Sequence, residues 1–125
     1  MMEFGGKYDA TIAVDFKKNR MRIHKDSLHK MDDPRYIQLL VNVERSQVAI
    51  RGMDKNFKGS NAQKVNAADI LPDCCCEIYS RAFMLTLSSV FSRFDEPCTY
   101  RLLGRVLPEH RMVVFDVETI QKVES

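Results

Sequence analysis

The sequence predicts an α+β domain with a mostly antiparallel sheet, in which the chain uses a strand-helix-hairpin unit twice. Short runs of alternating apolar and polar residues recur along the chain, separated by polar turn residues. A strand-like run followed by a helix-starting polar residue occurs as RMRIHKDSL at 20–28 and again as CEIYSRAFM at 76–84. Only the second run continues with a long apolar stripe, which predicts one longer amphipathic helix there. At 125 residues, the chain is expected to form a single domain over 1–125.

The first predicted element is a β-hairpin that starts near residue 8. Ile12, Val14 and Phe16 alternate with smaller or polar residues, which places three apolar side chains on one face of a strand. The polar run at 17–20 is typical of a turn, and the alternation resumes at Met21.

A brief helix and a second hairpin are predicted next. Asp26 or Ser27 is expected to cap the helix, because a short side-chain oxygen accepts bonds from unpaired backbone amides. The helix is expected to end before Asp33, since a residue that precedes proline is biased away from helical geometry. Residues 36–52 then give two β-rich runs around the four-residue turn VERS. The first unit is therefore assigned to about 8–53.

Residues 54–73 are predicted to form a long connection with one helical turn around 62–68. Gly, Asn, Lys and Asp dominate this stretch, with scattered apolar anchors. Connections of this length in compact domains are often functional or disordered.

The second unit is assigned to about 74–120. Ser80 is the expected cap of the longer helix, which is expected to end at Glu96-Pro97. Its apolar stripe consists of Phe83, Leu87, Val90, Phe91 and Phe94. A third hairpin is predicted to turn at 107–110, and the tail at 118–125 is expected to fray or to add a turn of helix.

The two units match at fixed offsets, which indicates an internal duplication. An offset of 64 places Tyr36 on Tyr100 in the hairpins, and an offset of 55 places Ile23 on Ile78 in the strands before the helices. The difference makes the second helix region nine residues longer. A chance match of hydrophobic positions is the alternative.

RMRIHKDSLHKM followed by YIQLLVNVERSQVAIRG resembles the unit of the AbrB/MraZ-type swapped-hairpin transcriptional regulators. The resemblance covers about residues 10–53 well and 76–118 loosely, and it implies two units in one chain that binds DNA. Asp33-Pro34-Arg35 stands where that family has a Gly-Asp pair. The repeated order also resembles one domain of a DNA sliding clamp, whose helices face the duplex, but the helix after Ser80 has only Arg81 and Arg93 as cations.

Positive charge gathers in residues 17–30, where six cations and one anion leave a net charge of +5. These cations are Lys17, Lys18, Arg20, Arg22, Lys25 and Lys30, and the anion is Asp26. Such a cluster on a hairpin is predicted to contact the phosphates of double-stranded DNA. A solvated hairpin face is the alternative. Arg101 and Arg105 are expected on one face of a later strand, where phosphate contact and simple solvation both remain open.

The sequence gives little support for catalysis, a cofactor or a metal. Cys74, Cys75 and Cys76 are consecutive, and neighbouring strand residues point to opposite faces, so they cannot readily converge on one ion. His24, Asp26 and Ser27 contain the letters of a catalytic triad, but proximity along a strand does not produce its geometry. We therefore expect no enzyme activity, no cofactor and no metal site.

The sequence predicts a cytoplasmic protein with reduced thiols and no membrane contact. No apolar run approaches the roughly 20 residues that cross a bilayer, and the first residues lack the pattern of a secretory signal. The apolar helix is expected in the core, or with one flank in a homodimer interface. The predicted function is non-enzymatic binding, as a DNA-binding regulator or accessory factor or, alternatively, as a protein-interaction or assembly module.

Overall fold

The computed structural model describes residues 8–55, 62–65 and 75–123. The strands are β1 (Ala10–Asp15), β2 (Arg20–His24), β3 (Tyr36–Asn42), β4 (Gln47–Met53), β5 (Gln63–Lys64), β6 (Cys75–Tyr79), β7 (Thr99–Leu107) and β8 (Met112–Val123). The helices are α1 (Lys25–Lys30) and α2 (Arg81–Val90), and a short 3-10 helix, η2 (Pro108–His110), precedes β8.

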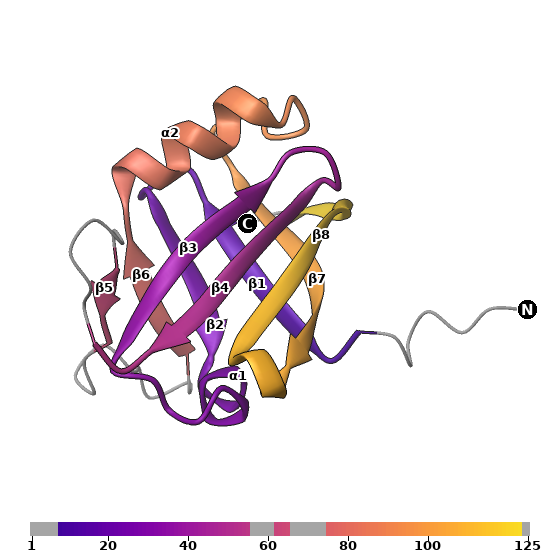
Figure 1. Cartoon of the computed structure of the whole chain (residues 1–125). Helices are drawn as coiled ribbons and strands as arrows, with labels where there is room; N and C mark the ends of the chain where they lie inside the picture. The colour runs from indigo at the N-terminus through magenta and orange to yellow at the C-terminus, as the bar shows by residue number, and fades with distance from the viewer. Residues whose placement is uncertain (1–7, 56–61, 66–74, 124–125) are drawn as a thin grey trace, which may run out of the picture.

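All eight strands belong to one antiparallel sheet, in the order β5-β3-β4-β8-β7-β1-β2-β6. The sheet curls around its apolar face, and α1 and α2 lie at opposite ends of the curl (Figure 1). The curl brings β5 and β6, the two outermost strands of this order, to opposite walls of a hollow of about 190 Å³. The mixed helix and strand content and the single antiparallel sheet confirm the predicted α+β class.

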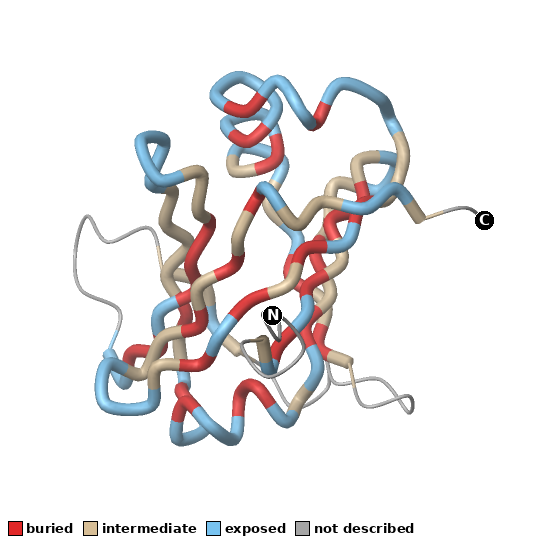
Figure 2. Tube along the Cα trace, turned by 90° about the vertical axis from the view of Figure 1, so that its right-hand side faces the viewer, coloured by how far each residue is buried: buried red, intermediate tan, exposed pale blue. Residues whose placement is uncertain are grey.

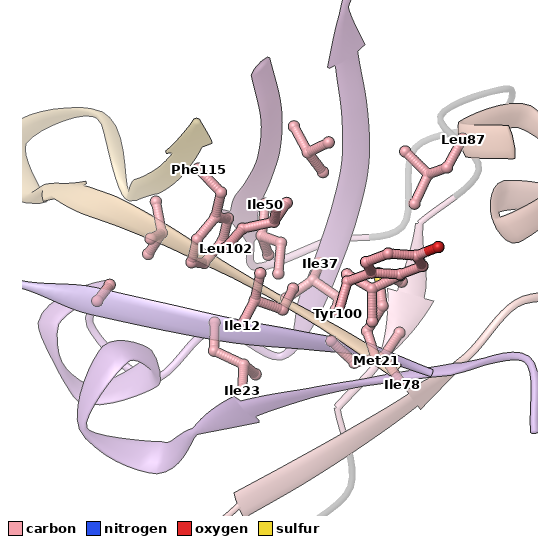
Figure 3. Packing of buried hydrophobic residues seen from close by; sticks show 14 of the residues in the cluster. Ile12, Met21, Ile23, Ile37, Ile50, Ile78, Leu87, Tyr100, Leu102 and Phe115 are labelled. Atoms are coloured by element: carbon pink, nitrogen blue, oxygen red, sulfur yellow. The ribbon is translucent and has the colours of Figure 1, made fainter. Parts of the chain in front are cut away.

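The core fills the inside of the curl. Inward positions alternate with outward ones along each strand, as in β2, where Met21 and Ile23 are fully buried and their neighbours are not. Figure 2 shows the buried residues along the inside of the sheet and the exposed ones on the turns and the outward side of α2. Figure 3 shows Ile12, Leu102 and Phe115 in this core, with Leu87 reaching it from α2.

Helix α2 is shorter than the apolar stripe predicts. Ser80 caps it by accepting a hydrogen bond from the Phe83 amide at 3.2 Å. The helix ends at Val90, whereas Phe91 and Phe94 lie beyond it and are still buried. Of the predicted stripe, Leu87, Phe91 and Phe94 are buried, whereas Phe83 is half-buried and Val90 is exposed. The spacing overestimated the helix, because a non-helical segment can bury side chains at similar intervals.

An aromatic cluster holds this end of the molecule together. The Phe94 ring lies 5.3 Å from Phe16 and 5.2 Å from Tyr100, measured between ring centroids, and Phe16 meets Tyr100 edge-on at 5.9 Å. The Tyr100 hydroxyl accepts a hydrogen bond from the Glu96 amide at 3.1 Å. The cluster therefore links the segment after α2 to the end of β1 and to β7.

The cap of α1 differs from both predicted residues. His24 is the N-cap, and its Nδ1 accepts a hydrogen bond from the Asp26 amide at 3.1 Å. Ser27 lies inside the helix and is buried. The prediction was wrong because an imidazole nitrogen can accept the same amide bond as a serine or aspartate oxygen.

Two other segments also differ from their predictions. Gln63 and Lys64 form β5 beside β3, where a helical turn was expected. Residues 118–123 continue β8, where fraying or a helical turn was expected. Cys74 lies outside the described residues, while Cys76 is buried in the core.

Arg111 links several segments at the end of the molecule that carries α1. It has a left-handed backbone between η2 and β8, and its carbonyl accepts a hydrogen bond from Gly52 at 2.7 Å. Its guanidinium donates to the Met31 carbonyl at 3.0 Å and to the Asp54 carboxylate at 3.0 Å. The hydrogen bond from Arg111 lowers the pKa of Asp54 below its ordinary value. One side chain thus joins the end of α1 to the segment after β4.

Gly104 is required by close approach between β7 and β8. A Cβ at this position would lie 2.4 Å from the Val114 carbonyl oxygen and 2.6 Å from Cδ1 of Phe115. At Gly52, the nearest atoms would be Cβ of Pro34 at 2.9 Å and Cγ of Pro34 at 3.1 Å, with no backbone atom closer than 3.4 Å.

Gly104→Ala is expected to lower the free energy of unfolding by about 3 kcal/mol, because the added methyl forces backbone and a core ring apart. Gly52→Ala is the matched control and is expected to cost less, because only the Pro34 ring must shift. Urea-induced unfolding of both variants measures the difference. An equal loss in the two variants would contradict this account of the β7–β8 contact.

Candidate nucleic-acid interface

The outward face of β2, β1 and β7 carries a row of two arginines separated by an alanine. Ala13 of β1 is the register partner of Arg22 on β2 and of Arg101 on β7. Neighbouring strands lie about 4.8 Å apart, so the two arginine Cα atoms are about 10 Å apart. The small Ala13 side chain separates the two arginines in this row.

Glu77 of β6 is the register partner of Arg22, so the row continues into an ion-pair network that reaches toward the β1–β2 turn. Arg20 Nε lies 3.2 Å from the Asp15 carboxylate, and Arg20 Nη1 lies 2.5 Å from Glu77. Glu77 also lies 3.5 Å from Arg22 Nε and accepts a hydrogen bond from the Tyr79 hydroxyl at 2.9 Å. The pKa of Arg20 is raised, first by hydrogen bonding with Tyr79 and then by the negative charge of Glu77.

This network orders the turn that carries two lysines. The Asp15 carboxylate accepts hydrogen bonds from the Lys17 and Lys18 amides at 3.0 and 3.3 Å. The lysine side chains themselves are exposed. Asp15 thus fixes the backbone from which two cations extend at the end of the hairpin.

We call Lys17, Lys18, Arg20, Arg22 and Arg101 the basic face. Asp15 and Glu77 are its carboxylates, so five cations and two anions leave a net charge of +3. Asp95 and Glu96 lie at the same end of the molecule but are balanced by Arg93 and Lys122, and the Lys122 amine is 2.7 Å from Glu96. The face therefore keeps its positive sign when these neighbours are included.

The structure does not bring all eight predicted cations together. Lys25 and Lys30 lie on α1, at the opposite end of β2 from the turn (Figure 1). The four steps along β2 from its first residue to its last span about 13 Å. Arg105 is outward on β7 but lies four residues beyond Arg101, across from Val114 of β8. The sequence cluster is thus split between two ends of the sheet.

A hollow of about 350 Å³ lies on the outward side next to the arginine row. Tyr8, Thr11, His24, Lys30 and Leu103 are among its lining residues. The Tyr8 hydroxyl donates a hydrogen bond to the carboxylate of Asp116 at 3.0 Å, and this bond raises the pKa of Tyr8. Polar and apolar groups line the hollow, and Lys30 lies at the far edge of the outward face.

His24, Asp26 and Ser27, the residue types of a catalytic triad, lie at the start of α1, and His24 caps the helix. Since His24 Nδ1 accepts the Asp26 amide, the ring proton of the neutral form lies on Nε2. The Asp26 carboxylate lies 3.6 Å from the same Nδ1, and Ser27 is buried. Within the described part of the chain, no group of three or more His, Cys, Asp or Glu side chains is placed to hold a metal ion.

Four residues of this site were not predicted from the sequence: Ala13, Asp15, Glu77 and Tyr79. The sequence gives no sign that Ala13 belongs to a site, and only the strand register shows that it lies between two arginines. Glu77 and Tyr79 reach the basic face only because β6 pairs with β2, more than fifty residues away along the chain. Strand alternation could have identified Ala13 as outward, but no local signal indicates a pairing between distant strands.

No protein-family model, curated protein or solved structure matches the chain. None of the helices in the described ranges has the length and apolar character needed to span a membrane.

Glu77→Gln is expected to lower the free energy of unfolding by about 1–2 kcal/mol, because a charged acceptor shared by Arg20, Arg22 and Tyr79 becomes neutral. Glu118→Gln, at an exposed position of β8, is the control and is expected to change it by less than about 0.5 kcal/mol. Chemical unfolding at neutral pH provides the comparison. Equal stability of the two variants would show that the network does not stabilise the β2–β6 pair.

Proposed function

We propose that the protein is a small cytoplasmic, non-enzymatic binding protein that contacts double-stranded DNA through the basic face, as a regulator or accessory factor. The observation that supports this proposal most strongly is the register that aligns Arg22 and Arg101 on either side of Ala13. Lys17 and Lys18 extend the same positive surface at the end of the hairpin. Cations fixed on an outward sheet face neutralise phosphates without reading bases, so the expected binding is salt-dependent and weakly sequence-specific.

The fixed network favours phosphate contact over a merely solvated surface. Glu77 and Asp15 form ion pairs with Arg20, whose side chain is only 17% exposed. Arg20 therefore orders its neighbours and offers little exposed surface for contact with a ligand. Arg101 and the two turn lysines are exposed and available for contact. Ordering the surface in advance lowers the entropic cost of binding.

We also propose that the two strand-helix-hairpin units are related by duplication, as the resemblance to AbrB/MraZ-type regulators implies. The order strand, helix, strand, strand occurs as β2-α1-β3-β4 and as β6-α2-β7-β8. Corresponding strands pair with each other antiparallel, β2 with β6 and β4 with β8, as a two-fold relation between halves requires.

The hairpin offset that fits this relation is 65 and not 64. An offset of 64 places half-buried Tyr36 on buried Tyr100, and a one-residue slip in a strand exchanges its two faces. An offset of 65 places buried Ile37 on buried Leu102, and it superposes Ser46 and Arg111, which both have left-handed backbones before a strand.

A protein-interaction module is the second candidate function. It is favoured by a different surface, around α2, where large apolar side chains are exposed. The two functions use opposite kinds of surface, one charged and one neutral, so one experiment can separate them.

The double variant Lys17→Ser/Lys18→Ser is expected to weaken binding to an arbitrary DNA duplex at low salt. It should also reduce the slope of log affinity against log salt by roughly 2, since each lost phosphate contact removes about one released counterion. Fluorescence anisotropy at several salt concentrations measures both quantities.

Lys25→Ser/Lys30→Ser is the matched control, because it removes the same charge from the opposite end of β2. The control is expected to keep the wild-type slope. Absence of binding by the wild-type protein at low salt, or equal losses in both double variants, would contradict a phosphate contact at the basic face.

A further inference from the structure

Exposed apolar side chains gather at the end of the molecule that carries α2. Within the described ranges, four large hydrophobic residues are exposed: Val43 by 54%, Tyr79 by 57%, Leu85 by 58% and Val90 by 37%. Leu85 and Val90 belong to α2, and Tyr79 ends β6 one residue before the helix cap. Val43 lies in the β3–β4 turn at the same end (Figure 1). Isolated exposed apolar residues are ordinary, but their confinement to one end indicates an interaction surface.

The outward side of α2 is also almost uncharged. Its exposed residues are Arg81, Ala82, Leu85, Thr86, Ser88, Ser89 and Val90. Arg81 is the one charged residue in the helix and stands at its first position. A solvated helix normally carries several charges on its outward side, so this side is suited to contact with protein.

The same helix side offers both a projecting side chain and a place to receive one. Leu85 projects from the exposed side of the helix. Ala82 lies three residues before it, Thr86 one residue after it and Ser89 four residues after it, so these three residues surround it on the helix surface. Residues at these spacings form the four-residue hole that accepts a side chain from a facing helix. A surface of this kind is complementary to itself.

We infer that a second copy of the chain binds here, with the two α2 helices packed antiparallel about a two-fold axis near Leu85. A two-fold interface brings the same surface of both copies together and therefore requires self-complementarity. The small side chains of Ala82 and Ser89 allow the helix axes to approach closely around the two leucines. Val43, Tyr79 and Val90 are the other exposed large apolar side chains at this end of the molecule.

The position of Arg81 supports a second copy as the occupant. A cation in the first turn is unfavourable within its own helix, because the helix dipole places positive charge at that end. In an antiparallel pair, Arg81 lies beside the C-terminal end of the partner's helix, where the dipole is negative. The pairing thus converts an unfavourable interaction in the monomer into a favourable one across the interface.

Helix α2 is anchored firmly enough to present this surface. Met84 and Leu87 are buried against the sheet, and Ser80 and Phe91 are hydrogen-bonded at its two ends. The outward side of the helix therefore has a fixed relation to the curled sheet. Interfaces built around one helix pair are among the smaller specific ones, which bury about 1,200 Å² in total, so we expect a concentration-dependent dimer.

Sedimentation velocity of the full chain from micromolar to near-millimolar concentration tests the proposal. The wild-type protein is expected to shift from monomer to dimer over this range. Leu85→Glu is expected to raise the dissociation constant by at least roughly a hundredfold, because the two-fold axis places the buried charge in the interface twice. His110→Glu, at an exposed position at the other end of the molecule, is the control and should sediment as the wild type does.

Arg81→Glu distinguishes this arrangement from any other use of the helix. The substitution should raise the melting temperature of the dilute monomer, because an anion suits the first turn. It should also weaken the dimer, because the same anion then faces the negative end of the partner helix. These opposite effects follow only from antiparallel packing of α2 on itself.

Mild oxidation of Leu85→Cys provides a test that does not depend on weakening the dimer. The covalent dimer should form faster than in His110→Cys, which contains the same native cysteines. The inference would be overturned if the wild-type protein stayed monomeric at the highest concentration or if the dimer survived Leu85→Glu. It would also be overturned by a tighter dimer in Arg81→Glu or by equal cross-linking of the two cysteine variants. None of these readouts involves DNA, so the outcome is independent of the proposed function.

Discussion

Strand β1 pairs with β2 on one side and with β7 on the other, and this double pairing holds the sheet together. Without it, β2 and β6 would be separated from the other five strands of the described sheet, β7, β8, β4, β3 and β5. Its inward residues Ile12 and Val14 are almost fully buried, so the pairing is supported by core contacts as well as by hydrogen bonds. Because β1 fixes the register of both neighbours, it also determines which side chains share the outward face. The basic face is therefore a consequence of the same pairing that completes the core.

The two proposed binding surfaces differ in chemistry and adjoin at the α2 end of the sheet, where the Asn19 carbonyl accepts a hydrogen bond from the Ser80 amide at 3.3 Å. The outward side of β2, β1 and β7 carries charge, and its carboxylates, buried Asp15 and half-buried Glu77, set the positions of neighbouring cations. The outward side of α2 is nearly neutral and exposes Leu85. Tyr79 belongs to both surfaces, because its hydroxyl donates a hydrogen bond to Glu77 and its exposed side chain directly precedes the α2 cap.

Local patterns in the sequence predicted much of the fold but little of the site. Alternation identified the hairpins, and Ser80 was recognisable as a cap because its oxygen and the Phe83 amide are three residues apart. His24 was missed as a cap because imidazole is an uncommon acceptor at that position. The basic cluster at 17–30 is continuous in sequence, but β2 carries the chain from one end of the sheet to the other and separates its members. Arg101 joins Arg22 only through β1, and such a relation between distant segments depends on tertiary pairing.

We propose that phosphate contact occurs on the outward side of β2, β1 and β7. Titration of the isotopically labelled full chain with a short DNA duplex at low salt, followed by backbone amide NMR shifts, tests it most directly. We expect the largest shifts at Ala13, at residues 17–22 and at Arg101, and we expect them to diminish as salt is added. Shifts confined to α1 or to α2, or no shifts at low salt, would contradict it.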